Sequence, residues 1–137
     1  MNKKLIVLHE TLYPYNQVKG AIQSAESDSS YHYVILIDGT LVSIADPSSY
    51  VQAVGNKVYR DIEDVDLVGI HISLESPYNS SPEDENHKGY EEKQYITLAK
   101  LINGLGFTAD KVITHGEVDE SYRDPRNLDA RYLISLL

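Results

Sequence analysis

Two histidines and one aspartate have the residue types and the spacing of a metal site. His9 follows the apolar run 4–8 and His115 follows the run 111–114, so each lies where a predicted strand ends. Asp124 comes nine residues after His115, behind a polar connection, and the proline that follows it favours an extended backbone. Imidazole and carboxylate groups suit Zn²⁺. If the two strands are neighbours, His9, His115 and Asp124 meet at one point.

Each histidine has a simpler interpretation when it is taken alone. A histidine at the end of a strand is more often a hydrogen-bonded boundary residue than a metal ligand. Two matched strand-end histidines followed by an Asp-Pro pair favour the metal site. The chain has no cysteine, so imidazole and carboxylate are the only strong protein ligands that it offers.

Composition limits the range of functions. The chain has 137 residues, of which 42% are hydrophobic, and this length predicts one domain with its own core. A formal net charge of −9 argues against nucleic-acid binding. The apolar run after Met1 is too short for a signal peptide or a membrane span. We therefore expect a cytoplasmic chain without membrane contact, which host-cell lysis could release. We favour a monomer.

The order of hydrophobic patterns predicts an α/β fold. Asp38 and Gly39 are typical of a hairpin turn, and Asn16 is a candidate helix cap. Alternation over 66–74 puts His71 on the face opposite the apolar one, so we expect it to face a more polar side. Strands are expected at 4–8, 31–37, 40–44, 66–74 and 111–114, and helices after Asn16, at 90–104 and at 129–137, the last packing through Leu133, Ile134 and Leu137. Residues 46–64, 75–89 and 116–121 are expected to be loops.

These pieces resemble the zinc-dependent N-acetylmuramoyl-L-alanine amidases in their order and spacing. The family includes amidase-type phage lysins, wall-recycling amidases and peptidoglycan recognition proteins. The motifs that carry the resemblance are His9-x-Thr11, Tyr31-His32-Tyr33-Val34-Ile35 followed by Asp38-Gly39, Val68-Gly69-Ile70, and Thr114-His115-x-Glu117 with Asp124-Pro125. The resemblance spans nearly all of residues 1–137 and implies a mixed central β-sheet flanked by helices. It places the zinc ligands on the same three residues.

The resemblance also implies an activity and further site residues. Such a chain would hydrolyse the amide bond between N-acetylmuramic acid and L-alanine in peptidoglycan or muropeptides, as a phage-type lysin. Tyr31 resembles the active-site tyrosine of the family, and His71 stands where cytosolic relatives often place a glutamate general base. Many relatives carry a lysine where this chain has Tyr122, and Arg123 is the residue expected to supply that positive charge, with Arg126 nearby.

Two other functions fit the same resemblance. The first is a peptidoglycan recognition module that binds muropeptides without cleaving them, which the replacement of the lysine by Tyr122 favours. The second is a structural phage component that keeps the fold. A complete set of three ligands favours the enzyme, because noncatalytic recognition proteins commonly lose a ligand.

Overall fold

The sheet is built around β1, Leu5–Glu10, a strand whose residues are all buried. The computed structural model describes residues 2–22, 31–55, 57–77, 87–121 and 124–137. The other strands are β2, Tyr33–Ile35; β3, Leu41–Ser43; β4, Gly69–Leu74; and β5, Val112–Thr114. The helices are α1, Tyr15–Ile22; α2, Val65–Val68; α3, Glu92–Gly104; the 3₁₀ turn Ala109–Lys111; α4, His115–Val118; and α5, Ala130–Leu136.

The strands form a mixed sheet in the order β3-β2-β4-β1-β5. β1 is parallel to β4 on one side and to β5 on the other, and β2 is parallel to β4. β2 and β3 are antiparallel and form the hairpin that Asp38 and Gly39 predict, with Gly39 at a positive φ of 88°. The predicted mixed α/β sheet is confirmed. β1 and β5 are neighbours, which is the condition under which His9 and His115 can meet.

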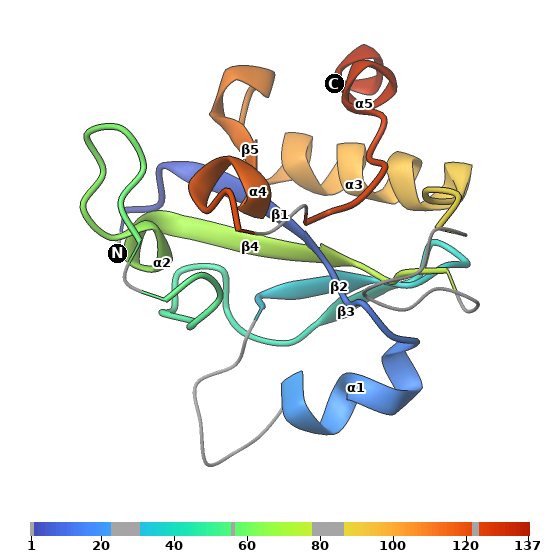
Figure 1. Ribbon diagram of the computed structural model, residues 1–137. Helices are drawn as coiled ribbons and strands as arrows, with labels where there is room; N and C mark the ends of the chain where they lie inside the picture. The colour runs from blue at the N-terminus through green and yellow to red at the C-terminus, as the bar shows by residue number, and fades with distance from the viewer. Residues whose placement is uncertain (1, 23–30, 56, 78–86, 122–123) are drawn as a thin grey trace.

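Alternate residues of the central strands pack into two different hydrophobic clusters, one on each face of the sheet. Ile6 and Leu8 join Ile70 and Ile72 in the core beneath α3 and α5, whereas Leu5, Val7, Val54, Val65 and Ile113 form a smaller cluster on the other face. In Figure 1, α3 and α5 lie on one side of the sheet and α1 on the other. Both faces of β1 and β4 are therefore covered, as is usual for parallel strands.

The long helix α3 forms where its amphipathic sequence predicts it. Glu91 and Gln94 form a reciprocal capping box at its start, and Leu98 and Ile102 are fully buried on its apolar face. Asp129 caps α5 by accepting a hydrogen bond from the backbone N–H of Tyr132. None of the described helices is long and apolar enough to cross a membrane.

Several predicted boundaries are wrong for local reasons. α1 begins at Tyr15, so Asn16 lies inside this helix and does not cap it. The expected strand 66–74 begins only at Gly69, because Asp64 caps a single helical turn over Val65–Val68. β2 and β3 are shorter than predicted, and the expected extension of the first helix to Ala25 lies outside the described residues.

His71 lies on the face of β4 opposite Ile70 and Ile72, as predicted, and its neighbours there are the polar His9, His32 and Asp66. This polar side is closed to solvent, because the relative exposure of His71 is 0%. One prediction about exposure is wrong. The sequence predicts that the last helix packs through Ile134 as well as Leu133, but Ile134 is 56% exposed, whereas Leu133 is buried.

The contrast between buried Ile102 and exposed Ile134 gives a test of the core. We expect Ile102→Ala to lower the free energy of unfolding by about 2–5 kcal/mol, since it leaves a cavity between α3 and the sheet. Ile134→Ala is the matched control and should change it by less than about 0.5 kcal/mol. Urea unfolding of both variants measures the difference, and equal losses would contradict this assignment of the core.

Candidate functional site

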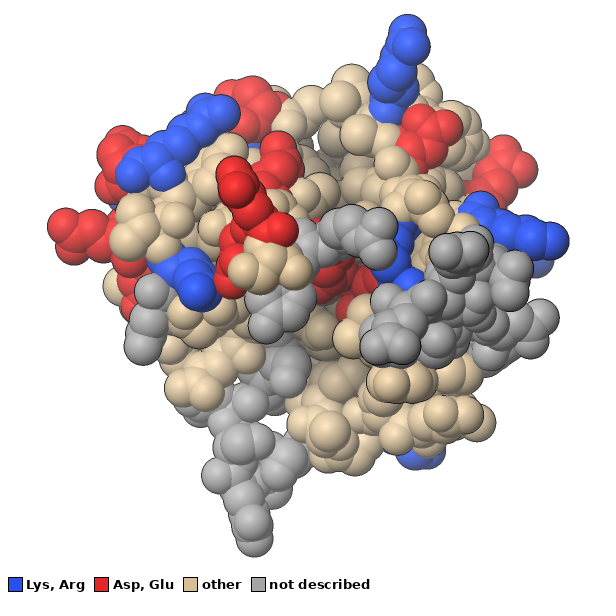
Figure 2. Space-filling view, in the orientation of Figure 1, with Lys and Arg blue, Asp and Glu red and all other residues tan. Residues whose placement is uncertain are grey.

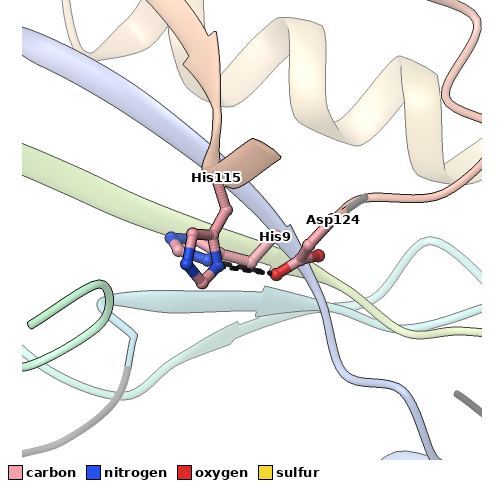
Figure 3. Close-up of side chains that lie close together, drawn as sticks. All are labelled: His9, His115 and Asp124. Atoms are coloured by element: carbon pink, nitrogen blue, oxygen red, sulfur yellow. Dashed lines mark hydrogen bonds and ion pairs between the residues drawn. The ribbon is translucent and has the colours of Figure 1, made fainter. Parts of the chain in front are cut away.

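The three residues predicted as metal ligands lie together at one end of β1 and β5. His9 is the penultimate residue of β1, His115 is the first residue of α4, and Asp124 comes from the segment before α5. Figure 3 shows the two imidazole rings and the carboxylate directed at one another. One donor atom from each side chain lies within 4.8 Å of the others. His115 Nδ1 is 2.9 Å and His9 Nδ1 is 3.6 Å from Asp124 Oδ2.

The motif Thr114-His115-x-Glu117 has a structural reason for its spacing. The Thr114 hydroxyl accepts a hydrogen bond from the Glu117 backbone N–H, and the Glu117 carboxylate accepts one from the Thr114 N–H. This reciprocal capping box starts α4 directly after β5, which corrects the expected polar loop after His115. His115 is thereby held at the junction of a strand and a helix, on rigid backbone.

Asp124 is fixed from two sides. Its Oδ1 accepts a hydrogen bond of 2.6 Å from the Glu10 backbone N–H, and its own carbonyl accepts one of 2.8 Å from the Gly116 N–H. Burial opposes the charged form of the Asp124 carboxyl, but its interactions with His115 and His9 outweigh burial and hold its pKa below the usual value. The site therefore keeps a carboxylate between two imidazoles.

The environment of His9 supports the fit of a zinc ion to these three donors. Burial lowers the pKa of His9, so its ring is neutral at pH 7, and among the described residues its Nδ1 has no hydrogen-bond partner. A buried polar atom without a partner is costly, and here it faces a carboxylate oxygen. A cation between these atoms would satisfy both. Two imidazoles and one carboxylate also match the ligand types of catalytic zinc sites.

Tyr31 lies against this group as the sequence predicted. Its ring centroid is 5.0 Å from that of His9, and its hydroxyl is 3.5 Å from the Glu10 carbonyl oxygen. Burial, with the charge of Asp124 as a second cause, raises the pKa of the Tyr31 phenol. The phenol therefore stays a proton-bearing donor beside the three residues.

His71 lies one layer behind the three ligands. Its Nδ1 is 2.9 Å from His9 Nε2, and its Nε2 is 3.4 Å from Asp66 Oδ1. Burial, with the nearby His9 and His32 as further causes, lowers the pKa of His71 well below its ordinary value. Both ring nitrogens are therefore directed at protein groups, and the role of general base stays a prediction.

Glu10, which follows His9 on β1, contacts a second group of polar residues on the opposite face of the strand. Glu10 is 1% exposed, and its carboxylate lies 2.7 Å from Arg126 Nε and 2.6 Å from Arg126 Nη2. It also accepts a hydrogen bond of 2.9 Å from the Tyr90 hydroxyl, and His87 Nε2 is 3.5 Å away. Figure 2 shows Asp and Glu atoms at the bottom of a hollow, with Lys or Arg atoms beside them.

Sequence reasoning missed several residues that support the site. Glu10 and Asp66 are acidic residues inside or beside apolar runs, and that placement is the signal that could have marked them as buried and paired. His87 fell in a segment expected to be a loop and gave no such signal. Tyr122 and Arg123 lie outside the described residues, so the positive charge expected from Arg123 stays a prediction.

The mixed sheet thus carries a cluster of two histidines and one aspartate that could hold a metal ion, with His9 and His115 at the ends of β1 and β5. The chain belongs to the N-acetylmuramoyl-L-alanine amidase family, and the sequence model of that family matches residues 1–127. The family resemblance of the motifs is thereby confirmed. Among curated proteins, none matches the sequence significantly.

Solved structures share the fold at low sequence identity. AmpDh3 from Pseudomonas aeruginosa, in complex with anhydromuramic pentapeptide, is 16% identical with a TM-score of 0.81 over 98% of this chain and 59% of that one. A selenomethionine derivative of AmpD is 20% identical, with a TM-score of 0.80 over 100% and 86%. The Ph2119 endolysin from the Thermus scotoductus MAT2119 bacteriophage Ph2119 is 18% identical, with a TM-score of 0.65 over 99% and 85%. This chain thus spans little more than half of the AmpDh3 chain.

The buried pair of Glu10 and Arg126 gives a prediction about stability. We expect Arg126→Leu to lower the free energy of unfolding by about 3 kcal/mol, because it leaves the Glu10 carboxylate buried without its cation. Arg131→Leu, on the exposed side of α5, is the matched control and should have little effect. Urea unfolding measures both variants, and an Arg126→Leu protein as stable as the control would contradict the prediction.

Proposed function

We propose that this protein is a zinc-dependent hydrolase of the amide bond between N-acetylmuramic acid and L-alanine. The observation that carries the proposal is the cluster of His9, His115 and Asp124 in a chain of the amidase family. His9 and His115 would hold the zinc ion through their Nδ1 atoms and Asp124 through Oδ2. The substrate would be peptidoglycan or a muropeptide, and the Pseudomonas aeruginosa relative was crystallised with an anhydromuramic pentapeptide.

The chemistry divides between the ion and the side chains. When bound, zinc supplies a Lewis acid and lowers the pKa of a bound water to about 7. Tyr31 keeps its phenolic proton and would donate a hydrogen bond to the charge that develops on the substrate oxygen. Arg123 would add positive charge. For His71, the sequence predicts the role of proton acceptor.

The alternative function is a binding module that holds muropeptides without cleaving them. The set of metal ligands favours the enzyme over this alternative. The three donors are all present, and the buried His9 Nδ1 has no other described partner, which is what a metal site requires. A module that only held muropeptides would have no need of this arrangement.

The proposal is tested by metal analysis and by hydrolysis of a purified muropeptide. We expect about one zinc per chain, loss of both zinc and activity in Asp124→Ala, and loss of activity on chelation that added zinc restores. Tyr31→Phe should keep its zinc but turn over about 10²-fold more slowly, because one donor to the developing oxyanion is removed. Wild-type protein that binds zinc and muropeptide without cleavage would establish the binding module instead.

The role as a phage-type lysin depends on whether intact wall is attacked. The chain carries a formal net charge of −9, and bacterial wall contains anionic polymers, so repulsion acts over about a Debye length of 8 Å at physiological ionic strength. We expect hydrolysis of sacculi to speed up as salt is raised to that strength, while hydrolysis of a short muropeptide stays nearly constant. Initial rates across a salt series at fixed pH and zinc measure this. Fastest sacculus hydrolysis at the lowest salt would refute the repulsion argument.

A further inference from the structure

A chain of buried polar groups leads from Asp66 through His71 to His9. Asp66 and His71 are each 0% exposed, and His9 is 1% exposed. The contacts are 3.4 Å from Asp66 Oδ1 to His71 Nε2 and 2.9 Å from His71 Nδ1 to His9 Nε2. All three groups are shielded from solvent, so each ring proton must be placed by its neighbours.

The Asp66 end determines where His71 carries its proton. Asp66 Oδ1 accepts a hydrogen bond from the Val54 N–H and Oδ2 accepts one from the Gly55 N–H, both at 2.9 Å. These donors hold a carboxylate beside His71 Nε2. A neutral imidazole has one N–H and one lone pair, and a lone pair on Nε2 would face the carboxylate oxygen. The proton of His71 therefore belongs on Nε2.

The same reasoning then fixes the tautomer of His9. With its proton on Nε2, His71 has a lone pair on Nδ1 and can only accept, so His9 Nε2 must donate across the 2.9 Å contact. The neutral His9 ring then has its lone pair on Nδ1, the atom that faces Asp124 Oδ2. The reverse assignment would direct a proton on His9 Nδ1 at Asp124 Oδ2 over 3.6 Å, but it would set a lone pair of His71 Nε2 against Asp66 Oδ1 at the shorter distance of 3.4 Å.

Two neighbours hold the His71 ring in this position. His32 stacks on it with ring centroids 5.9 Å apart and planes 10° apart, and His32 Nδ1 accepts a hydrogen bond from the His71 backbone N–H. Gly69 packs so closely that a Cβ at this position would lie 3.1 Å from His71 Nε2 and 2.8 Å from the Val65 carbonyl oxygen. The ring has little room to turn.

We propose that Asp66 and His71 are positioning residues that keep the proton of His9 on Nε2 and so present its Nδ1 lone pair to the metal. The inference rests on the metal site of the proposed function. It differs from the general-base prediction for His71, which requires the residue to exchange a proton with the reacting groups. Here the residue acts through His9 and touches neither substrate nor metal.

The first test is the zinc affinity of folded variants, measured by competition with a chelator of known affinity. His71→Leu removes the acceptor for His9 Nε2–H and should weaken zinc binding by about 10- to 100-fold. His71→Gln keeps a side-chain acceptor and should lose clearly less. Asp66→Asn should weaken binding in the same direction, whereas Glu63→Gln, an exposed residue of the same segment, should bind zinc as the wild type does.

A general base gives the opposite pattern. Replacing it would lower turnover by about 10²- to 10⁴-fold while zinc affinity stayed unchanged. Unchanged zinc affinity in folded His71→Leu and Asp66→Asn would therefore overturn the proposal.

The second test needs no variant, so it holds even if His71→Leu fails to fold. Nitrogen-15 spectra of the histidine rings in metal-free wild-type protein near pH 7.5 report which ring nitrogen carries each proton. We expect His9 and His71 both to be protonated on Nε2. A proton on Nδ1 of either ring would overturn the proposal. If zinc affinity and tautomers follow the expectation but no muropeptide is cleaved, the proposed hydrolysis fails and this inference stands.

Discussion

The burial of β1 on both faces is the constraint on which the site depends. A strand with neighbours on both edges and covered faces has no access to water, so the polar side chains of His9 and Glu10 at its end need partners other than water. Because successive side chains point to opposite faces, the two residues need separate sets of partners. His9 meets His115 and His71 on one face, and Glu10 meets Arg126 and Tyr90 on the other.

Asp124 joins these two sets. One carboxylate oxygen faces the imidazoles of His9 and His115, and the other accepts the backbone N–H of Glu10. Two residues that follow Asp124 are also bound. The Arg126 backbone N–H donates to the Glu10 carboxylate, and the Asn127 side-chain amide donates to the His87 carbonyl. A ligand from an irregular segment is thus held in place by hydrogen bonds on both sides, and a metal site needs donors that are held in this way.

The sequence predicts the parts of this structure that depend on local patterns. Apolar runs identified the central strands, and the residues at the ends of two of them identified His9 and His115. What it could not predict depends on register and packing. The pairing of Val7 with His71 puts the latter behind His9, and no periodicity in the chain states which strands pair. The capping box at Thr114 was visible as a Thr-x-x-Glu spacing, but a competing expectation of a polar loop hid it.

The attachment of the Asp124 segment has a consequence for how an ion would be captured. A segment tied down by an ion pair and several hydrogen bonds loses its conformational entropy when the chain folds. Capture of an ion then demands little further ordering, so affinity reflects coordination chemistry more than loop closure. Selection among ions would then depend on the types of donor that the three side chains offer, and an ion that prefers a larger shell of oxygen ligands would find too few of them.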